Sequence, residues 1–456
     1  MQKQSYNRYA KARECLLVAF ASLLIYMTSP VITSLDSAFT VPTALSLMYE
    51  GNADLNEYPD FLASRNPRAV EWIDGRAYSI FPVAISATAL PFVIPAEWLL
   101  PRLFEWFPAL DRLARNAAGD VFELPAGPLD CLALYPAVEW GVASCYAALA
   151  AAMLFAMARR RLTRHRAWML TMLFALGTSM WSTASRGLWQ HGPAILMLLA
   201  GLWCVGDASR IRGLRGGICL ALAYLIRPTF ALPAAAIGLY LLVHHRRAAW
   251  RYAAGAALPV AAFAVWNLAH FGQPLPPYFN PARLVFSDRT VEALIGNLIS
   301  PSRGLLIFSP FVLWVFPPMA RALRAGPGGG LDFFLALVPP AHLAMLALFY
   351  HWWGGYSIGP RLMSDILPIL FWFLIPVFAL PWHAPAAWHR WAFAAACAWS
   401  IGVHGHAARN FAVHYWNERP VSVDAAPERL WDWSDPQFLR HTNPLAAPPA
   451  EPGNRK

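Results

Sequence analysis

The stretch CLLVAFASLLIYMTSPVITSLDSAF, residues 15–39, begins with a long apolar run and places a single acid, Asp36, just after that run. An α-helix needs about 20 predominantly apolar residues to cross the hydrocarbon core of a membrane. Basic residues tend to stay on the cytoplasmic side, and four precede the run: Lys3, Arg8, Lys11 and Arg13. We therefore expect residues 15–33 to form an uncleaved first helix that delivers Asp36 to the outer face.

The rest of the chain shares this apolar character. The chain has 456 residues, of which 57% are hydrophobic and 14% charged. A soluble protein carries roughly 25% charged residues. The apolar runs are continuous and rich in Leu and Ala, whereas a membrane-spanning β-strand alternates over about ten residues. The sequence therefore predicts an all-α polytopic membrane protein in contact with membrane lipids.

The net charge of +10 does not indicate a nucleic-acid partner. The basic residues lie in short clusters between apolar runs, as they do in cytoplasmic loops. The six cysteines lie in or beside apolar segments without CxxC spacing, which predicts neither a disulfide framework nor a zinc site.

The basic clusters also predict how the chain crosses the membrane. The cluster RRRLTRHR at 159–166 is expected inside, so a single return helix at 131–158 leaves residues 34–130 as a large outer loop. Within this loop, residues 78–100 are interrupted by three prolines, which predicts a helix lying at the outer interface. Nine further helices bring the total to about eleven: 167–184, 192–206, 216–226, 229–243, 251–268, 304–320, 331–349, 362–380 and 391–406.

This threading divides the chain into a membrane domain, residues 1–406, and an outer tail, residues 407–456. The N-terminus is then cytoplasmic and the C-terminus extracytoplasmic. The tail is polar, and we expect it to fold over the outer face before fraying after Pro444.

One pair of helices is unusually short. Residues 216–243 must form a hairpin whose limbs are each about 21 Å long, at 1.5 Å per residue. Because the bilayer core is about 30 Å thick, Arg227 at the turn is expected to lie below the outer surface. A charge at that depth costs several kcal/mol unless it is paired or hydrated. Arg227 is therefore either a ligand for an anion, a structural ion pair or a snorkelling side chain.

Other basic residues also lie at outer helix ends, against the general charge bias. Arg186 and His191 lie in the turn before 192–206, while Arg303 and Arg361 open later helices. Arginine matches phosphate oxygens in bidentate fashion, and helix N-termini favour anions. Outer arginines also bind lipid headgroups, but the group together predicts a site for a phosphorylated lipid.

Five short segments resemble the GT-C glycosyltransferases, and the last two look like the bacterial mannosyl- and arabinosyltransferase-like members in particular. The resemblance covers about residues 10–405 in layout. The segments are SLDSAF (34–39), GRAYSIFPVAISATALP (75–91), LIRPT (225–229), SPSRGLLIFSP (300–310) and WWGGYSIGPRLMSDILPIL (352–370).

The resemblance implies an enzyme of the bacterial inner membrane with its active site outside the cytoplasm. Its donor would be a polyprenyl-phosphate sugar, carrying a pentose such as arabinofuranose or a hexose such as mannose. The acceptor would be an extracytoplasmic protein, lipopolysaccharide or wall glycan. The family's acid at the end of the first helix corresponds to Asp36, which would act as general base.

The family often carries an adjacent Asp-Glu pair in its outer loops. This chain has no such pair there, and Asp54 and Glu57 are the nearest substitute. Without an adjacent Asp-Glu pair, a bound metal ion is not favoured, so we expect no cofactor.

The chemistry also follows from the residues. Inverting transfer needs a base, worth about 10²–10⁴ in rate. It also needs donors on the departing phosphate, worth roughly 3–4 kcal/mol each. Asp36 suits the first role, and the second suits a basic group: Arg227, Arg303, Arg361, Arg186 and His191. The rings of Tyr78 and Tyr356 suit a sugar face.

Each assignment has a structural alternative. Asp36 is alternatively a capping residue, Asp54 and Glu57 are solvated loop acids, and His191 is a turn residue. A transporter or flippase would also hold a phosphate, but it should have access from both faces. An O-antigen-ligase-like enzyme would carry its large outer loop late in the chain. His404, His406 and His414 have no metal-site spacing.

Overall fold

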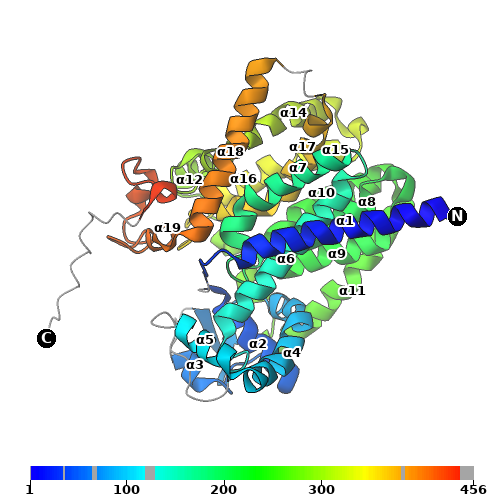
Figure 1. The fold of residues 1–456 in the computed structure, drawn as a ribbon. Coiled ribbons are helices and arrows are strands. Elements are labelled where there is room, and N and C mark those ends of the chain that lie inside the picture. The colour runs from blue at the N-terminus through cyan, green and yellow to red at the C-terminus, as the bar shows by residue number, and fades with distance from the viewer. Residues whose placement is uncertain (1, 34–35, 64–68, 119–128, 382–385, 442–456) are drawn as a thin grey trace. The chain divides into compact units, whose positions relative to one another are not determined.

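The computed structural model describes residues 2–33, 36–63, 69–118, 129–381 and 386–441, and these are mostly helical (Figure 1). The chain divides into two compact units. Unit 1 contains Met1–Leu23, Ile32–Leu154 and Ala184–Pro281. Unit 2 contains Leu24–Val31, Phe155–Thr183 and Ala282–Lys456.

In the described part of the chain, four helical segments are long and apolar enough to cross a membrane. They are α4 (Val83–Trp106), α6 (Tyr135–Ala158), α11 (Arg246–Phe271) and the continuous segment Arg361–Ala379. Several shorter apolar helices accompany them among the described residues. The protein is thus largely α-helical with membrane-spanning character, while the eleven crossings stay a prediction.

Two features of the expected N-terminal half are corrected. The first helix, α1 (Gln2–Met27), ends six residues before the expected end at residue 33. In the expected interfacial segment 78–100, Pro82 precedes the helix, while Pro91 and Pro95 lie inside α4, which is one continuous helix.

Unit 1 also contains a small β-hairpin that the apolar pattern does not predict. Strand β1 (Val70–Ile73) pairs antiparallel with β2 (Arg76–Ser79). The turn is Asp74–Gly75, with φ of 49° and 77°. An Asp-Gly pair suits this turn because both residues need a positive φ. The other elements of unit 1 are η1 (Asp36–Phe39), α2 (Thr40–Tyr49), α3 (Pro59–Ala63), α5 (Pro108–Ala118), α8 (His191–Val205), η4 (Ala208–Arg210), α9 (Gly213–Ile226), η5 (Pro228–Phe230), α10 (Ala231–His244) and η6 (Pro277–Phe279).

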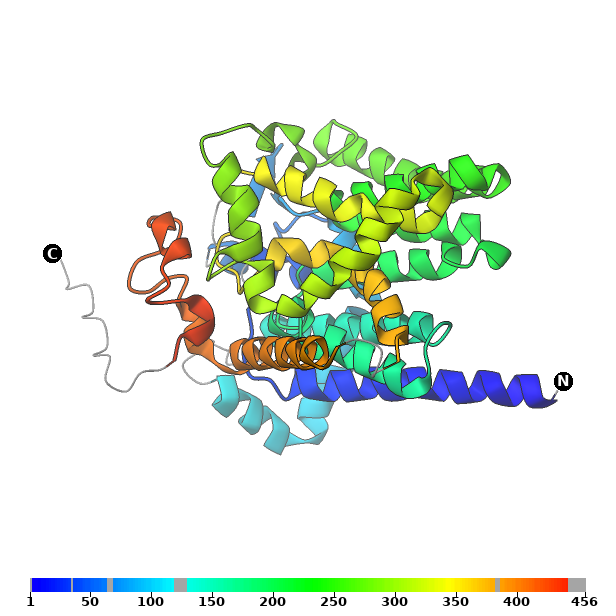
Figure 2. The same cartoon turned by 90° about the horizontal axis from the view of Figure 1, so that it is seen from above.

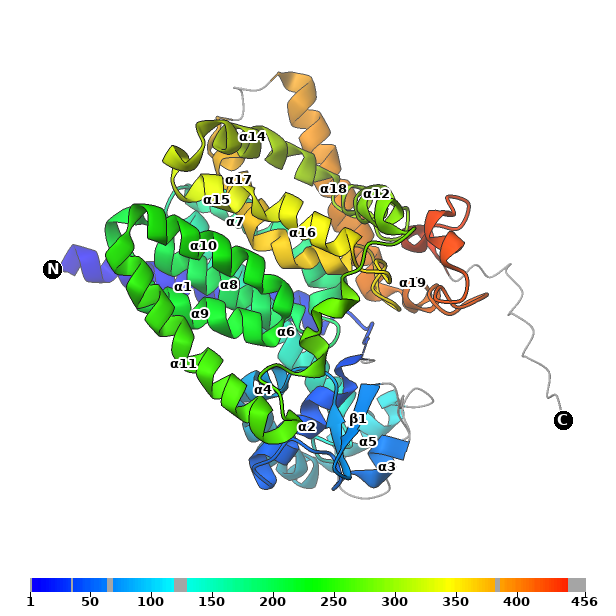
Figure 3. The same ribbon diagram turned by 180° about the vertical axis from the view of Figure 1, so that it is seen from behind.

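The helices α8, α9, α10 and α11 pack side by side (Figure 3). Helix α9 approaches α11 so closely that only glycine fits between their backbones. A Cβ atom at Gly217 would lie 2.0 Å from the carbonyl oxygen of Tyr252, and one at Gly255 would lie 2.1 Å from that of Leu214. Small residues let membrane helices approach each other closely in this way.

Unit 2 is built from short helices joined by breaks. The expected helix 304–320 is divided into α13 (Leu305–Phe308), η8 (Pro310–Val315) and α14 (Phe316–Ala325). Pro310 explains the first break, since the residue before a proline avoids the helical conformation. The other elements are α7 (Arg164–Leu176), η3 (Met180–Ala184), α12 (Thr290–Ile299), η9 (Pro327–Gly329), α15 (Leu331–Ala336), α16 (Val338–Ala347), η10 (Arg361–Ile366), α17 (Leu367–Ala379), α18 (Ala387–Arg409), α19 (Phe411–Tyr415), η11 (Pro427–Trp431) and η12 (Gln437–Leu439), while η7 (Pro281–Arg283) lies at the unit boundary.

A buried polar chain crosses unit 2 through His404 on α18. Ser309 Oγ donates its proton to Gly177 O (2.9 Å), so it can only accept from His404 Nε2 (3.1 Å). His404 Nδ1 is then the acceptor for Ser182 Oγ (2.7 Å) in η3, a π-helix. Through these hydrogen bonds, His404 joins three segments that are far apart in the sequence.

The C-terminal segment is folded as far as it is described. It follows α18 through α19 and η11 to η12 and packs against α18 (Figure 2). The fraying expected after Pro444 falls on residues 442–456, which lie outside the described residues.

Candidate functional site

The turn that begins at Asp36 is fixed against α6. The backbone of Asp36 starts η1, and its side chain lies outside the described part of the structure. Ser37 in the same turn is buried and donates a hydrogen bond to Glu139 Oε2 over 2.8 Å. Glu139 lies on α6, so this helix sets the position of the turn.

The segment before Asp36 is held to the loop 185–190. Thr33 N donates to Arg186 O (2.9 Å), and Trp189 Nε1 donates to Thr33 Oγ1 (3.1 Å). A Cβ atom at Gly187 would lie 2.7 Å from Thr33 O, so the approach requires glycine here. These contacts hold the turn of Asp36 beside the loop that carries Arg186 and leads into His191.

The basic side chains of this region are withdrawn from solvent. Arg186 and His191 are 0% exposed and Arg227 is 4% exposed. Arg186 Nε donates to Ser185 Oγ (3.0 Å), and Arg227 Nη1 donates to Gln190 Oε1 (3.2 Å). Arg227 follows α9 in an extended conformation, with φ −149° and ψ 119°. Burial in protein argues against the snorkelling interpretation of Arg227.

Two polar residues of this region were not anticipated from the sequence. Glu139 is 0% exposed and is the one acid in α6, a helix of 24 residues. An acid inside an apolar helix is by itself a signal for function, and that signal would have found Glu139. Gln190 precedes α8 and has no comparable sequence signal, because its importance comes from its contact with Arg227.

The other predicted site residues of unit 1 lie around the β-hairpin. Asp54 is buried and lies 3.5 Å from Arg76 Nη1, so it is not a solvated loop acid. Glu57 is exposed. Tyr78 is buried and packs edge-on against Phe271, with ring centroids 5.3 Å apart. A sugar would reach the ring of Tyr78 only after a local rearrangement.

In unit 2, Arg303 is buried and holds five protein oxygens at once. Its Nε donates to Trp353 O (2.8 Å). Its Nη1 and Nη2 donate to Ser302 O, Gln437 Oε1, Gly355 O and Asn417 Oδ1 over 2.7–3.1 Å. A guanidinium has five N–H donors, and all five are matched here. A phosphate would have to displace these bonds, so the geometry favours a structural role for Arg303.

The glycine-rich loop 353–359 is fixed by the C-terminal segment. Gln437 donates to Ser357 O (2.9 Å) and accepts from Gly359 N (3.0 Å). Tyr356 Oη hydrogen-bonds to Ser422 Oγ over 2.7 Å, so its hydroxyl is occupied by the same segment. The loop turns at Gly355, which has a φ of 65°.

Arg361 begins η10 immediately after this loop and is partly buried. Its Nη1 lies 3.4 Å from Gly354 O. Burial lowers the pKa of Arg303, and the positive charge of Arg361 lowers it further. Arg361 is the more accessible of the two arginines.

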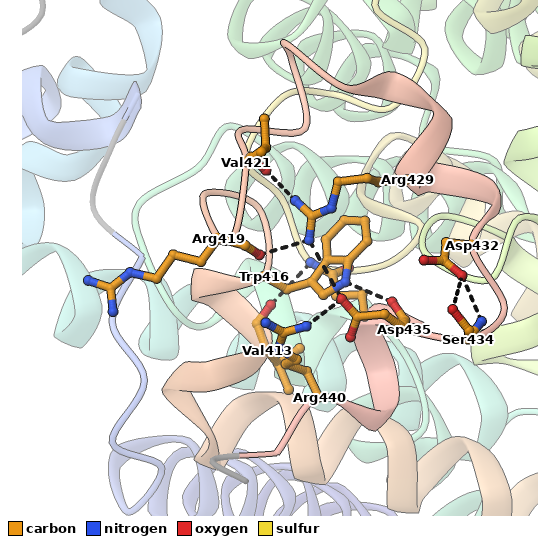
Figure 4. A network of polar contacts seen from close by, with 10 residues as sticks. Val413, Trp416, Arg419, Val421, Arg429, Asp432, Ser434, Asp435 and Arg440 are labelled. Atoms are coloured by element: carbon orange, nitrogen blue, oxygen red, sulfur yellow. Dashed lines mark hydrogen bonds and ion pairs between the residues drawn. The ribbon is translucent and has the colours of Figure 1, made fainter. Parts of the chain in front are cut away.

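The C-terminal segment has its own polar network (Figure 4). Arg429 lies over the ring of Trp416, 4.4 Å from its centroid, and donates to the carbonyl oxygens of Val421 and Arg419. Trp416 Nε1 donates to Asp435 O (2.8 Å), and Asp435 pairs with Arg440. The segment therefore has a defined fold of its own.

We expect Arg303→Gln to loosen this segment. The variant loses most of the five hydrogen bonds and leaves buried oxygens unsatisfied, which costs about 1–3 kcal/mol per group. Limited proteolysis of the purified protein should then cut within 410–441 at lower protease concentration. Arg419→Gln, at an exposed position of the same segment, is the matched control. Equal resistance of the two variants would contradict the structural role.

Among the described residues, no group of three or more His, Cys, Asp or Glu is placed to hold a metal ion. No family model, curated protein or solved structure shows significant similarity to this chain.

Proposed function

We propose that the chain is a membrane glycosyltransferase of the GT-C type, which transfers a sugar from a polyprenyl-phosphate donor to an extracytoplasmic acceptor. The observation that carries this proposal is that unit 1 holds the loop of Arg186 against the segment before Asp36, while Arg227 hydrogen-bonds to Gln190 at the end of that loop. Arginine matches phosphate oxygens in bidentate fashion, and the start of a helix favours anions. This arrangement supports a site for the phosphate of a lipid-linked donor.

The carboxylate and the basic side chains have different roles in the proposed reaction. Asp36 removes the proton from the acceptor hydroxyl as it attacks the anomeric carbon. The bond from that carbon to the phosphate oxygen breaks, and the departing phosphate takes the negative charge. Arg227, Arg186 and His191 stabilise this charge because they are already positioned around the phosphate before the reaction begins. Arg361 remains a predicted phosphate ligand in unit 2, whereas Arg303 is assigned to the protein fold.

The test is transfer by the purified protein in lipid nanodiscs. The donors are polyprenyl-phosphate-linked pentose and hexose, and the products are identified by mass spectrometry on periplasmic proteins and surface glycans. Transfer that depends on the protein supports the proposal. Movement of the intact lipid between leaflets, with no transfer, would instead indicate a flippase.

Arg227→Gln should weaken donor binding at least tenfold while leaving acceptor preference unchanged. The change keeps a polar side chain of similar length but removes the charge that meets the phosphate, and hydrogen bonds to charged groups are worth about 1.5–3 kcal/mol. The KM for donor and the KM for acceptor are measured separately. Arg283→Gln, at an exposed position, is the control. An equal rise in both constants would argue against a donor-specific contact.

A further inference from the structure

Gln190 is oriented by its contact with Arg227. The side chain of arginine has only donors, so the Gln190 atom that faces Arg227 Nη1 over 3.2 Å must be the carbonyl oxygen. The amide nitrogen therefore points away from Arg227. The two amide N–H donors of Gln190 therefore face away from the guanidinium.

These N–H donors have no acceptor in the part of the chain that the structure describes. Gln190 is 6% exposed, and its Nε2 has no hydrogen-bond partner among the described residues. Most buried polar groups in proteins are hydrogen-bonded, and an exception requires an explanation. A buried amide with unused donors next to the guanidinium of Arg227 suits an oxygen-rich anion.

A third positive element is the N-terminus of α8. Gln190 is the residue before this helix of 15 residues, which begins at His191. The N-terminus of a helix carries a partial positive charge and backbone N–H groups that favour anions. Gln190 thus lies where the start of α8 and the guanidinium of Arg227 come together.

We propose that Gln190 is a direct ligand of the donor phosphate and binds one phosphoryl oxygen through Nε2–H. The carbonyl oxygen of the same side chain holds Arg227 in place for a second oxygen. This inference rests on the proposed function and adds a neutral donor to the phosphate site. The neutral amide discriminates by hydrogen bonding, so it favours a ligand with an acceptor oxygen at this point.

The test compares two charge-matched variants of the full-length protein in nanodiscs. Gln190→Glu keeps the size and the oxygen facing Arg227 but replaces the donor by a second acceptor oxygen with negative charge. Gln273→Glu, at an exposed position of the same unit, is the control. Affinity is measured for undecaprenyl phosphate and for inorganic phosphate, and the thermal unfolding temperature is measured without either.

We expect Gln190→Glu to weaken undecaprenyl phosphate binding at least tenfold, with Gln273→Glu unchanged. Its unfolding temperature should be equal to or above that of the wild type, because a carboxylate pairs strongly with Arg227. If Gln190 served only in folding, any Gln190 variant that folds would bind undecaprenyl phosphate with unchanged affinity. If Gln190→Glu also loses affinity for inorganic phosphate, the contact is with the phosphoryl group itself. If it loses affinity for undecaprenyl phosphate alone, the contact is with a phosphate held in place by its lipid.

The failures are distinguishable. If Gln190→Glu binds both phosphates normally while Arg227→Gln does not, the amide donors serve only an ordered water, and the inference falls while the phosphate site stands. If the wild type binds neither phosphate, the inference and the proposed function both fall.

Discussion

Asp36→Asn should reduce sugar transfer by about 10²–10⁴-fold, the contribution of a positioned general base. The amide keeps the size of the side chain but cannot accept the proton of the attacking hydroxyl. Donor binding and the unfolding temperature should stay close to those of the wild type, because the site for the phosphate is built from other residues. Transfer is measured at saturating donor and acceptor in nanodiscs.

The matched control is Asp60→Asn in α3 of the same unit, where the acid is exposed. It should transfer sugar at the normal rate. Near-normal transfer by Asp36→Ala would remove Asp36 from the mechanism. In that event, Glu139, the buried acid hydrogen-bonded to the turn of Asp36 through Ser37, becomes the next residue to test.

Gly217→Ala should destabilise the protein by about 3 kcal/mol or more, at the upper end of the usual cost of overpacking. In most helices the same change is stabilising by up to about 1 kcal/mol. Here the new Cβ atom would lie 2.0 Å from a backbone oxygen of Tyr252, and backbone cannot move aside as a flexible side chain can. Helices α9 and α11 would have to separate.

Gly141→Ala in α6 is the control, because a Cβ atom there meets nothing within 4 Å. We expect Gly141→Ala to unfold at or above the wild-type temperature and Gly217→Ala to unfold well below it or to aggregate. Both are followed by thermal unfolding in detergent and by size-exclusion chromatography. Equal unfolding temperatures would mean that α9 and α11 are not in such close contact.

The apolar runs predicted helix ends most accurately where a cluster of charged residues lies close to the end of the run. The expected helices 131–158, 192–206 and 216–226 match α6, α8 and α9 within four residues at each end. The break within the expected helix 304–320 was not predicted, although Pro310 is a signal for it. The hairpin of β1 and β2 was missed although Asp74–Gly75 is a strong turn signal. The pattern of apolar and charged residues thus predicts the position of a helix better than the position of a break within it.

The site could be predicted only in part, because side-chain partners are set by the folded chain. Arg186, His191 and Arg227 were chosen from their position at helix ends, and unit 1 buries all three. Arg303 was chosen by the same rule, yet its acceptors come from residues up to 134 positions away. A rule based on helix ends therefore cannot separate a ligand-binding arginine from one that holds the fold.

The five acceptors of Arg303 also impose an order on biosynthesis. Asn417 and Gln437 follow Arg303 by 114 and 134 residues. At about 5–20 residues per second, the ribosome makes Gln437 roughly 7–27 s after Arg303. The three backbone acceptors, at Ser302, Trp353 and Gly355, are synthesised well before these two side chains. A nascent chain that stalls before Gln437 would carry an unfinished unit 2, and membrane quality-control proteases would meet it in that form.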